Sequence, residues 1–468
     1  MTVLKHNRII LFIFPFIVGL FTSYTLPPYN FFFINFFTFP LLLFFIISNK
    51  YKGKWASFYI GWMFGFGYFL SNLYWITNAL TFEDIFKPLI PFALIFIPLF
   101  LGLFYGLVTL GSYFFNLKKN FSSIIIFSTI FALIEYLRSF IFGGFPWNLI
   151  VYGLSNNLPS IQILSFIGTY SLNLLVITIF LLPSIIFFNY KKNIKIISLF
   201  LTFLIVFSNF IFGNIIIKKH EKIKETKLDF TIKVISPKIN INRFFANEDP
   251  EKIILDLINL SEPSKLKKTL FIFPEGVFSS IYLQDLKKYN YIFSNNYSNK
   301  HKIILGINSY EDSKIFNSLV VIDNNTNVLS KYDKNKLVPF GEFLPFEKFL
   351  KKLGFKKITE GYNSFTKGKD DSIIKINFDN KIINILSLIC YEIIFPNFTG
   401  NQEKNFNFIV NISEDAWFGN SIGPQQHFVK AIYRSIENGS YTVRSANMGV
   451  SAFISPTGKI LKILNSTE

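Results

Sequence analysis

Residues 381–392 of the chain read KIINILSLICYE, an apolar run that ends in a cysteine, a tyrosine and a glutamate. The run is short, rich in Ile and Leu, and preceded by the turn-forming pair Asp379-Asn380, which predicts a buried β-strand. Cys390 is the only cysteine of the 468 residues, and it would lie at the carboxyl end of this strand, where α/β folds place their sites. A thiol there is a candidate nucleophile, although free cysteine also serves as a small buried core residue.

The composition is too apolar for one soluble domain of this length. Hydrophobic residues make up 51% of the chain, 61 residues are phenylalanine, and the mean hydropathy is +0.38. The net charge of +18 comes mainly from lysines between apolar runs, which favours contact with a membrane surface over nucleic acid. One cysteine excludes a cysteine-rich metal site, and the four histidines lack metal-ligand spacing. We therefore expect a membrane protein with no metal, no cofactor and no nucleic-acid partner.

The first part of the chain contains seven apolar runs, each close to the about 20 residues that a membrane helix needs. They are residues 9–25, 31–48, 56–80, 88–115, 121–142, 161–188 and 194–217. Basic residues concentrate before the first run and in the connections after the second, fourth and sixth. This alternation is the positive-inside pattern. It predicts a transmembrane helical domain over residues 1–220 with a cytoplasmic N-terminus, followed by an extracytoplasmic C-terminal domain.

Two features of the predicted membrane part carry polar or aromatic groups. Glu135 and Arg138 are three residues apart in an apolar run, so they can pair on one helix face, either for structure or for function. Residues 143–148, GGFPWN, fall in a predicted outward connection. They are consistent with an aromatic anchor at the membrane interface or with part of a lipid-facing entrance.

The pattern changes at residue 228, where short strand-like runs begin to alternate with polar helices and turns. The runs are residues 230–236, 269–274, 302–307, 317–322, 372–378, 382–389 and 406–412. Such alternation is typical of an α/β domain whose sheets are covered by helices. We therefore expect a second domain over residues 228–468.

Polar groups follow several of these strands. Glu275 ends the apolar run TLFIFP, and burial there would suit a general base for a thiol, although a solvated loop acid is also compatible. Residues 331–342, KYDKNKLVPFGE, contain lysines that could stabilise an oxyanion or could be solvated. Residues 411–419, NISEDAWFG, end another strand. Together with Cys390, these termini predict one site at one edge of a sheet, and a Cys–His arrangement would instead need His427.

A glutamate after one strand, a lysine in the YDK…PFGE segment and the cysteine of CYE resemble the Glu–Lys–Cys triad of the nitrilase (carbon–nitrogen hydrolase) superfamily. Such a domain behind a multi-helix membrane part resembles the apolipoprotein N-acyltransferase family of bacterial inner membranes. Residues 135–147, 337–345 and 415–427 support this resemblance. It implies an αββα sandwich behind about seven transmembrane helices, in the inner membrane and with the catalytic domain periplasmic.

The resemblance also implies the site residues and the reaction. The triad is Glu275, Lys334 and Cys390, with Glu342, Tyr391 and Glu392 in support. The thiol would attack a phospholipid ester and form a thioester, and the acyl chain would pass to the N-terminal amine of a diacylglyceryl-apolipoprotein. A lysine between two acids stays charged, which agrees with a role in stabilising an oxyanion or a thiolate. A membrane-tethered amidase or nitrilase, and a non-enzymatic binding protein or transporter, remain the alternatives.

Three stretches bear on how the chain meets its substrates. Residues 343–357 have apolar and basic positions at helical spacing, which predicts either an interfacial amphipathic helix or an ordinary packed helix. Residues 236–245, SPKININRFF, replace the Gln-x-Asn and tryptophan that the family usually carries, and Phe244 or Phe245 would take over the packing. The sequence ends just after the turn at 455–459 and its return strand, so we expect the family's last strands and closing membrane helix to be missing.

Overall fold

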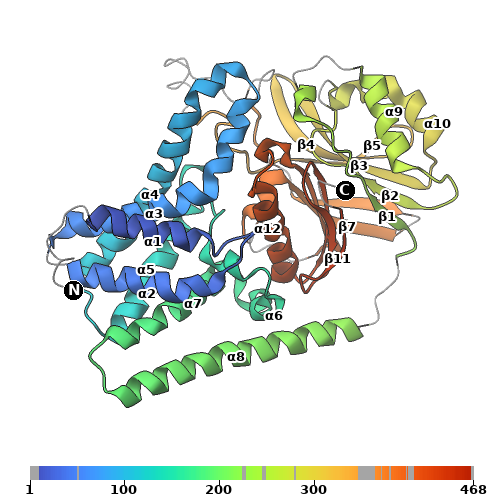
Figure 1. Cartoon of the computed structure of the whole chain (residues 1–468). Helices are drawn as coiled ribbons and strands as arrows, with labels where there is room; N and C mark the ends of the chain where they lie inside the picture. Colours follow the sequence, from blue (N-terminus) through green and yellow to red (C-terminus); the bar gives the residue numbers. More distant parts are fainter. Residues whose placement is uncertain are drawn as a thin grey trace. The chain divides into compact units, whose positions relative to one another are not determined.

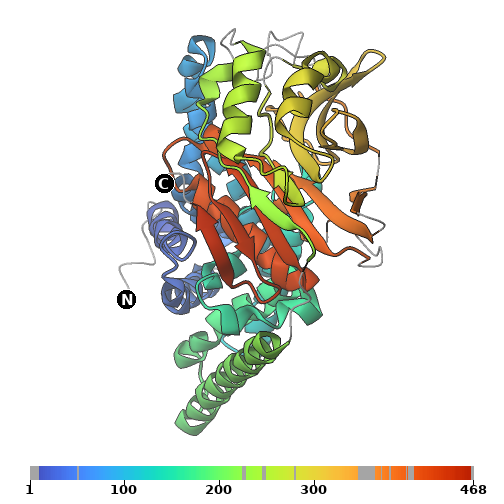
Figure 2. The same ribbon diagram turned by 90° about the vertical axis from the view of Figure 1, so that its right-hand side faces the viewer.

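The computed structural model describes residues 10–49, 52–223, 228–244, 249–278, 281–345, 364–369, 371–378, 381–396, 398 and 405–464. Contacts within the chain divide it into two compact units. The first comprises Met1–Glu221 and Asn420–Val429, and the second comprises Lys222–Gly419 and Lys430–Glu468. The first is helical and the second is built on β-sheets (Figures 1 and 2).

Each of the seven apolar runs falls on a helical element of the first unit. The helices are α1 (Ile10–Ser23), α2 (Asn35–Asn49), α3 (Lys54–Leu73), α4 (Ile90–Phe114), α5 (Phe121–Arg138), α6 (Leu158–Ile161), α7 (Leu164–Leu181) and α8 (Lys192–Lys222). Within the described residues, five helical segments are long and apolar enough to cross a membrane: Phe32–Asn49, Asp84–Phe114, Phe121–Arg138, Leu164–Phe187 and Lys192–Lys222. The helical membrane part is therefore confirmed, and the number of seven crossings stays a prediction.

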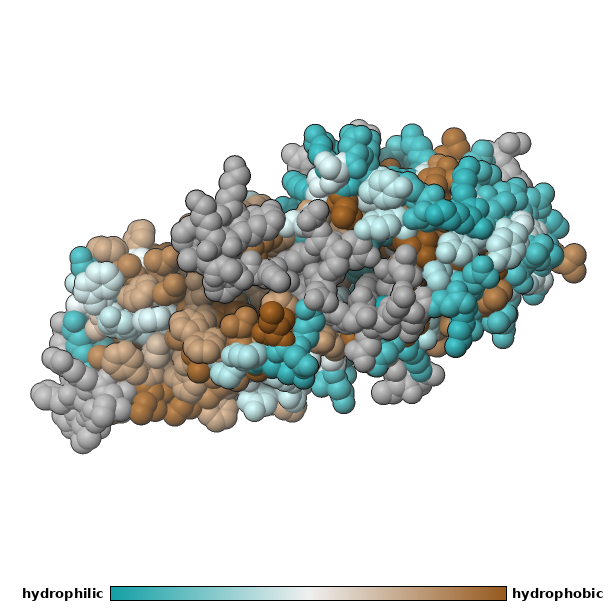
Figure 3. Space-filling model, turned by 90° about the horizontal axis from the view of Figure 1, so that it is seen from above, coloured by the Kyte–Doolittle hydropathy of each residue, from teal (hydrophilic) through white to brown (hydrophobic). Residues whose placement is uncertain are grey.

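Small residues let the helices of this unit approach closely. A Cβ atom on Gly61 of α3 would lie 2.1 Å from the carbonyl oxygen of Tyr105 on α4. Close backbone contact of this kind is typical of helices that pack in lipid, where no hydrophobic effect drives helices together. Large apolar side chains are exposed on the outside, above all along α8, and Figure 3 shows hydrophobic side chains gathered over this unit.

The second unit contains two sheets. The first consists of β1 (Thr231–Val234), β2 (Thr269–Ile272), β3 (His301–Glu311), β4 (Lys314–Ile322) and β5 (Val328–Asp333), in that order. The second consists of β6 (Ile373–Phe378), β7 (Lys381–Ile389), β8 (Phe408–Glu414), β9 (Tyr441–Asn447), β10 (Ser451–Ile454) and β11 (Ile460–Leu464), in the order β11-β10-β9-β8-β7-β6. β1, β2 and β3 pair in parallel, as do β7, β8 and β9, and the other neighbours are antiparallel.

Two apolar cores hold the sheets and helices of this unit together. One lies between the sheets, where Leu270 and Ile304 of the first sheet pack with Ile385 and Val410 of the second. The other joins the first sheet to α9 (Pro250–Ser261) and α10 (Asn290–Asn296), which cover its outer face (Figure 1). The α12 helix (Gly423–Asn438) contributes its residues from Lys430 onward to this unit and lies beside the second sheet. The layers are those of the predicted αββα sandwich.

All seven predicted strands of this domain are present, with ends shifted by a few residues. β5, β9 and β10 were not predicted, because their short runs mix apolar and polar residues. As a result, Lys331 lies within β5 rather than in a loop, and Lys334 directly follows the strand end. The strand expected after the turn at residues 455–459 is β11. The predicted amphipathic helix of residues 343–357 lies outside the described residues from position 346 on.

The close approach of β3 to the segment after β2 gives a test of this packing. A Cβ atom on Gly306 would lie 2.5 Å from the Cα atom of Glu275, so Gly306→Ala must push two strands apart. We expect a loss of about 1–3 kcal/mol of stability, as for other overpacked interiors. Thermal unfolding of the full chain in detergent measures it, with Ile304→Val, expected to cost about 0.5–1.5 kcal/mol, as the control. An unchanged midpoint for Gly306→Ala would show that the strands have room to move.

Candidate active site

Cys390 follows directly on β7 and begins a short 3-10 helix, Cys390–Ile394. Its φ of 47° is in the left-handed region, which a non-glycine residue adopts only when its surroundings enforce it. The residue is half-buried. Burial raises the pKa of the Cys390 thiol well above its ordinary value, and the charge of Glu275 adds to this, while Lys334 opposes it. The thiol therefore rests protonated and needs a base.

Lys334 lies directly after β5, and its side chain is only 1% exposed. The ammonium nitrogen is 2.9 Å from Oε1 of Glu342 and 3.3 Å from Oε1 of Glu275. Burial alone would lower the pKa of Lys334, but the carboxylates of Glu275 and Glu342 outweigh it, so the pKa lies above its ordinary value. The side chain of Lys334 therefore carries its positive charge at neutral pH, near the thiol.

Glu275 follows β2 and is held on both carboxylate oxygens. Its Oε1 accepts hydrogen bonds from Asn317 (2.7 Å) and Lys334, and its Oε2 accepts one from the backbone N–H of Glu414 (2.9 Å). The amide of Asn317 also donates to Oε1 of Glu342 (2.8 Å), and Oε2 of Glu342 accepts from the backbone N–H of Val338 (2.8 Å). Asn317 therefore aligns the two acids that flank Lys334.

Glu392 ties the end of β7 to the segment after β5. One of its oxygens accepts from the backbone N–H of Ile389 (2.8 Å), and the other from the Tyr332 hydroxyl (2.8 Å) and the N–H groups of Asn335 (2.6 Å) and Lys336 (3.0 Å). Burial raises the pKa of Glu392 to about 7, against the opposing effect of these donors and of Lys334. Glu392 thus fixes the spacing between Cys390 and Lys334.

The other predicted residues also have definite places. Tyr391 is buried and packs edge-on against Phe395, with ring centroids 5.2 Å apart. In the first unit, Trp147 is buried, donates to Oε1 of Gln426 (2.8 Å) and stacks on His427. Trp147 therefore packs inside the first unit, and both interpretations of residues 143–148, an aromatic anchor or part of a lipid-facing entrance, stay predictions.

The predicted pair of Glu135 and Arg138 is present, with 3.7 Å between the closest charged atoms. Glu135 also accepts hydrogen bonds from Tyr105 (2.8 Å) and Asn173 (2.6 Å). This places the carboxylate in a buried polar network of the helical unit. The side chains of Phe244 and Phe245, which we expected to replace a tryptophan, lie outside the described residues.

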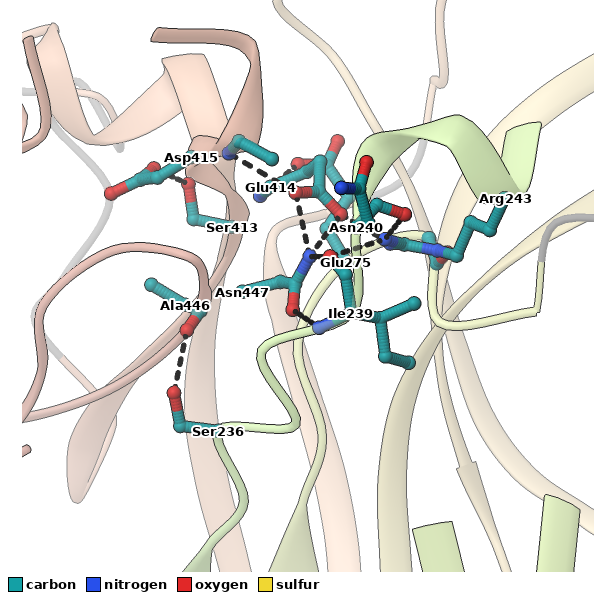
Figure 4. Close-up of polar contacts among 12 residues, drawn as sticks. Ser236, Ile239, Asn240, Arg243, Glu275, Ser413, Glu414, Asp415, Ala446 and Asn447 are labelled. Carbon is teal, nitrogen blue, oxygen red and sulfur yellow. Dashed lines mark hydrogen bonds and ion pairs between the residues drawn. The ribbon is translucent and has the colours of Figure 1, made fainter. Parts of the chain in front are cut away.

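Sequence reasoning missed several polar residues around the thiol. Asn317 is a single amide in the apolar strand β4, and nothing in the sequence distinguishes it. Ser413 shares a hydrogen bond with the thiol and donates to Asp415 (2.7 Å), and Arg444 also binds Asp415 (2.7 Å). Glu414 lies between Ser413 and Asp415 in the chain (Figure 4). The polar stretch NISEDAWFG predicted that residues 411–419 belong to the site, but it did not indicate which of their side chains contact the thiol.

The described residues contain no group of three or more His, Cys, Asp or Glu side chains that could hold a metal ion. The side chains that the structure brings together here are a thiol, the carboxylates of Glu275 and Glu342, and a buried ammonium group.

The raised pKa of Glu392 predicts a pH dependence of stability. In an unfolded chain a glutamate has a pKa of about 4.3, whereas burial raises the pKa of Glu392 in the folded protein to about 7. Between these two pH values, the folded protein therefore binds one proton more than the unfolded chain. The free energy of unfolding must then fall as the pH rises through this interval. Glu392→Gln should flatten the pH profile of the thermal midpoint between about pH 5 and 7. A profile as steep as that of the wild type would contradict this assignment.

Comparisons with known proteins agree with the architecture. Residues 18–182 match the family model of the apolipoprotein N-acyltransferase N-terminal domain, and residues 271–468 match that of the carbon-nitrogen hydrolases. The apolipoprotein N-acyltransferase of Rickettsia typhi is 32% identical over 465 residues, covering 97% of this chain and 89% of the relative. That of Brucella melitensis biotype 1 is 30% identical over 463 residues, covering 95% and 86%.

Among solved structures, a CN-hydrolase superfamily protein from Xanthomonas campestris is 15% identical, with a TM-score of 0.34 over 50% of this chain and 85% of that one. Saccharomyces cerevisiae Nit3, of the nitrilase superfamily, is 18% identical with the same score and coverage. Scores this low carry no argument, whereas the family models and the relatives together span nearly the whole chain. The chain therefore belongs to the apolipoprotein N-acyltransferase family of bacterial membrane proteins.

Proposed function

We propose that this protein transfers an acyl chain from a phospholipid to the N-terminal amine of a diacylglyceryl-cysteine lipoprotein, by way of a thioester on Cys390. The proposal rests on the surroundings of the Cys390 thiol. Cys390 directly follows β7 and lies near a buried lysine, Lys334, which is held between Glu275 and Glu342. The family relatives are named for this acyl transfer. The proposal assigns the triad roles to Glu275, Lys334 and Cys390.

In the first half-reaction, Glu275 takes the proton of the Cys390 thiol while the sulfur attacks the ester carbonyl carbon of the phospholipid. A base is required because burial disfavours the thiolate. The ammonium group of Lys334 stabilises the oxyanion of the tetrahedral intermediate. The ester C–O bond then breaks, Glu275 returns the proton to the leaving oxygen, and a lysophospholipid departs.

In the second half-reaction, the neutral amine of the lipoprotein attacks the thioester carbonyl. Glu275 accepts a proton from the amine, and Lys334 again stabilises the oxyanion. The C–S bond breaks, the thiol recovers a proton from Glu275, and an amide is left on the lipoprotein. The reaction is therefore of the ping-pong type, with one acyl group held by the enzyme between the two substrates.

The remaining site residues support the triad. Glu342 neutralises part of the charge of Lys334, and Glu392 holds the two strand ends at their spacing. Neither acid is needed to carry a proton in these steps. Tyr391 fixes the turn that follows the nucleophile by packing on Phe395.

The proposal also includes the placement of the chain in the cell. Residues 1–220 would form the transmembrane domain of an inner-membrane protein, with residues 228–468 as the periplasmic catalytic domain. Support comes from the alternation of basic connections and from the apolar helices. Phospholipid and lipoprotein would then meet the site from the same membrane.

Intact mass of the purified protein, measured after incubation with phospholipid alone, tests the proposal. We expect an adduct of one acyl chain on the wild type, removed by hydroxylamine and absent from Cys390→Ser. A lipopeptide that carries a free diacylglyceryl-cysteine amine should then take up the chain. Release of free fatty acid in place of transfer, or hydrolysis of an amide substrate, would instead identify a membrane-tethered amidase. The absence of any adduct would overturn the proposal.

The position of the triad lysine gives a second test. Lys334→Met should slow adduct formation by about 10²–10³-fold, the usual cost of losing a donor that stabilises an oxyanion. Lys331→Met is the matched control, because Lys331 pairs with Asp333 and is 27% exposed. It should leave the rate within about twofold of the wild type, a free-energy change below about 0.5 kcal/mol. Equal losses in the two variants would contradict the assignment of Lys334.

A further inference from the structure

A buried ionic cluster, made of Arg243, Glu414 and Asn447, lies beside the proposed triad and takes no part in the steps above (Figure 4). The three residues are at most 2% exposed. The guanidinium group of Arg243 forms an ion pair with the carboxylate of Glu414. The amide of Asn447 donates to both oxygens of the same carboxylate, at 2.9 and 3.1 Å.

Asn447 also fastens the segment that carries Arg243. Its side chain accepts from the backbone N–H of Ile239 (2.8 Å) and donates to the carbonyl oxygen of the same residue (2.7 Å). Arg243 follows in the short helix Ile241–Phe244 and donates to the carbonyl of Ile239 as well (3.2 Å). Asn447, the last residue of β9, therefore holds the segment that carries Arg243 in place.

Two contacts lead from this cluster to Glu275. The backbone N–H of Glu414 donates to Oε2 of Glu275 (2.9 Å). Arg243 donates through Nη2 (3.0 Å) and Nε (3.2 Å) to the carbonyl oxygen of Gly276, the residue after Glu275. The Arg243–Glu414 ion pair therefore contacts Glu275 at two points. Glu414 binds the carboxylate of Glu275, and Arg243 binds the backbone carbonyl of the next residue, Gly276.

The orientation of the Glu414 N–H depends on its own side chain. The carboxylate of Glu414 also accepts from the N–H of Ala416 (3.1 Å), and this bends the chain directly after β8. Burial raises the pKa of Glu414 to about 7, while the charge of Arg243 works to lower it. Without the guanidinium group, this carboxylate would lose its counter-ion in a site closed to water.

We propose that Arg243 and Glu414 are a positioning pair for Glu275, which they hold in the orientation that places its Oε1 on Lys334 and its Oε2 on the N–H of Glu414. The inference rests on the proposed function, because that function makes Glu275 the base. Lys334 and Asn317 bind Oε1, whereas the backbone N–H of Glu414 binds Oε2. Loss of the pair would let the carboxylate rotate and would slow proton transfer from the thiol.

The test compares variants of the full chain in detergent. Arg243→Met should slow acyl-adduct formation by about 10–100-fold, which corresponds to about 1.4–2.7 kcal/mol, while the KM for phospholipid stays within about twofold. The rate at which iodoacetamide alkylates Cys390 should fall as well, because this rate depends on deprotonation of the thiol and requires no lipid. In a Glu275→Gln background, Arg243→Met should have no further effect on that alkylation rate, because the group it positions is gone.

Arg434→Met is the matched control for the loss of a buried arginine. Arg434 pairs with Glu437 at 2.9 Å in α12, and both side chains are at most 4% exposed. We expect this variant to lower the thermal midpoint without slowing adduct formation. A rate for Arg243→Met equal to that of the wild type, an equal loss in Arg434→Met, or an undiminished effect of Arg243→Met in the Glu275→Gln background would overturn the inference.

The Glu275→Gln variant separates this inference from the proposed function. If Glu275→Gln forms the adduct at the wild-type rate, Glu275 is not the base, and both fail together. If Glu275→Gln is inactive while Arg243→Met keeps the wild-type rate, only the positioning role is lost.

Discussion

The proposed site depends on one buried ammonium group. Lys334 is held by Glu275 and Glu342, and two carboxylates around one cation leave this group with a net charge of about minus one when both are ionised. Burial is the main cause of the raised pKa of the Cys390 thiol, and the charge of Glu275 adds to it, because a thiolate would bring a second negative charge into this site. The charge balance also leaves the cation available when an oxyanion develops. In the proposed mechanism, the same cluster therefore keeps the thiol protonated at rest and lowers the barrier once substrate is bound.

The rest of the domain serves to bring this cation and the thiol together. β2, β5 and β7 all end at the site. β2 and β7 have parallel neighbours, and the carboxyl ends of parallel strands are where α/β folds gather functional groups. Glu392 spans the two sheets with hydrogen bonds from Ile389 at one end and from Asn335 and Lys336 at the other. Gly306 lets β3 lie against the backbone of Glu275. The contacts at Gly306 and between Glu392 and Ile389 are buried, so they resist small displacements.

Hydrophobic periodicity was sufficient to predict the helical membrane part and a separate α/β domain. The αββα arrangement of that domain was expected from the family resemblance. Glu275, Lys334 and Cys390 could be named from strand ends and from a family resemblance. Asn317 could not, since one amide in an apolar strand looks like any other. Arg243 and Glu414 are 171 residues apart, and only the folded chain brings them together. The grouping of Asn420–Val429 with the helical unit depends on tertiary contacts such as that of Gln426 with Trp147, which no local pattern predicts.

The central claim is that Cys390 carries the acyl group between two substrates. A pulse–chase experiment tests it most directly, with phospholipid labelled in the acyl carbonyl, rapid quenching and peptide-level mass mapping. The account predicts label on the peptide that contains Cys390 during the pulse, and its stoichiometric movement to the amine of a diacylglyceryl-cysteine lipopeptide during the chase. Labelled lipopeptide formed at full rate without any label passing through Cys390 would contradict the account.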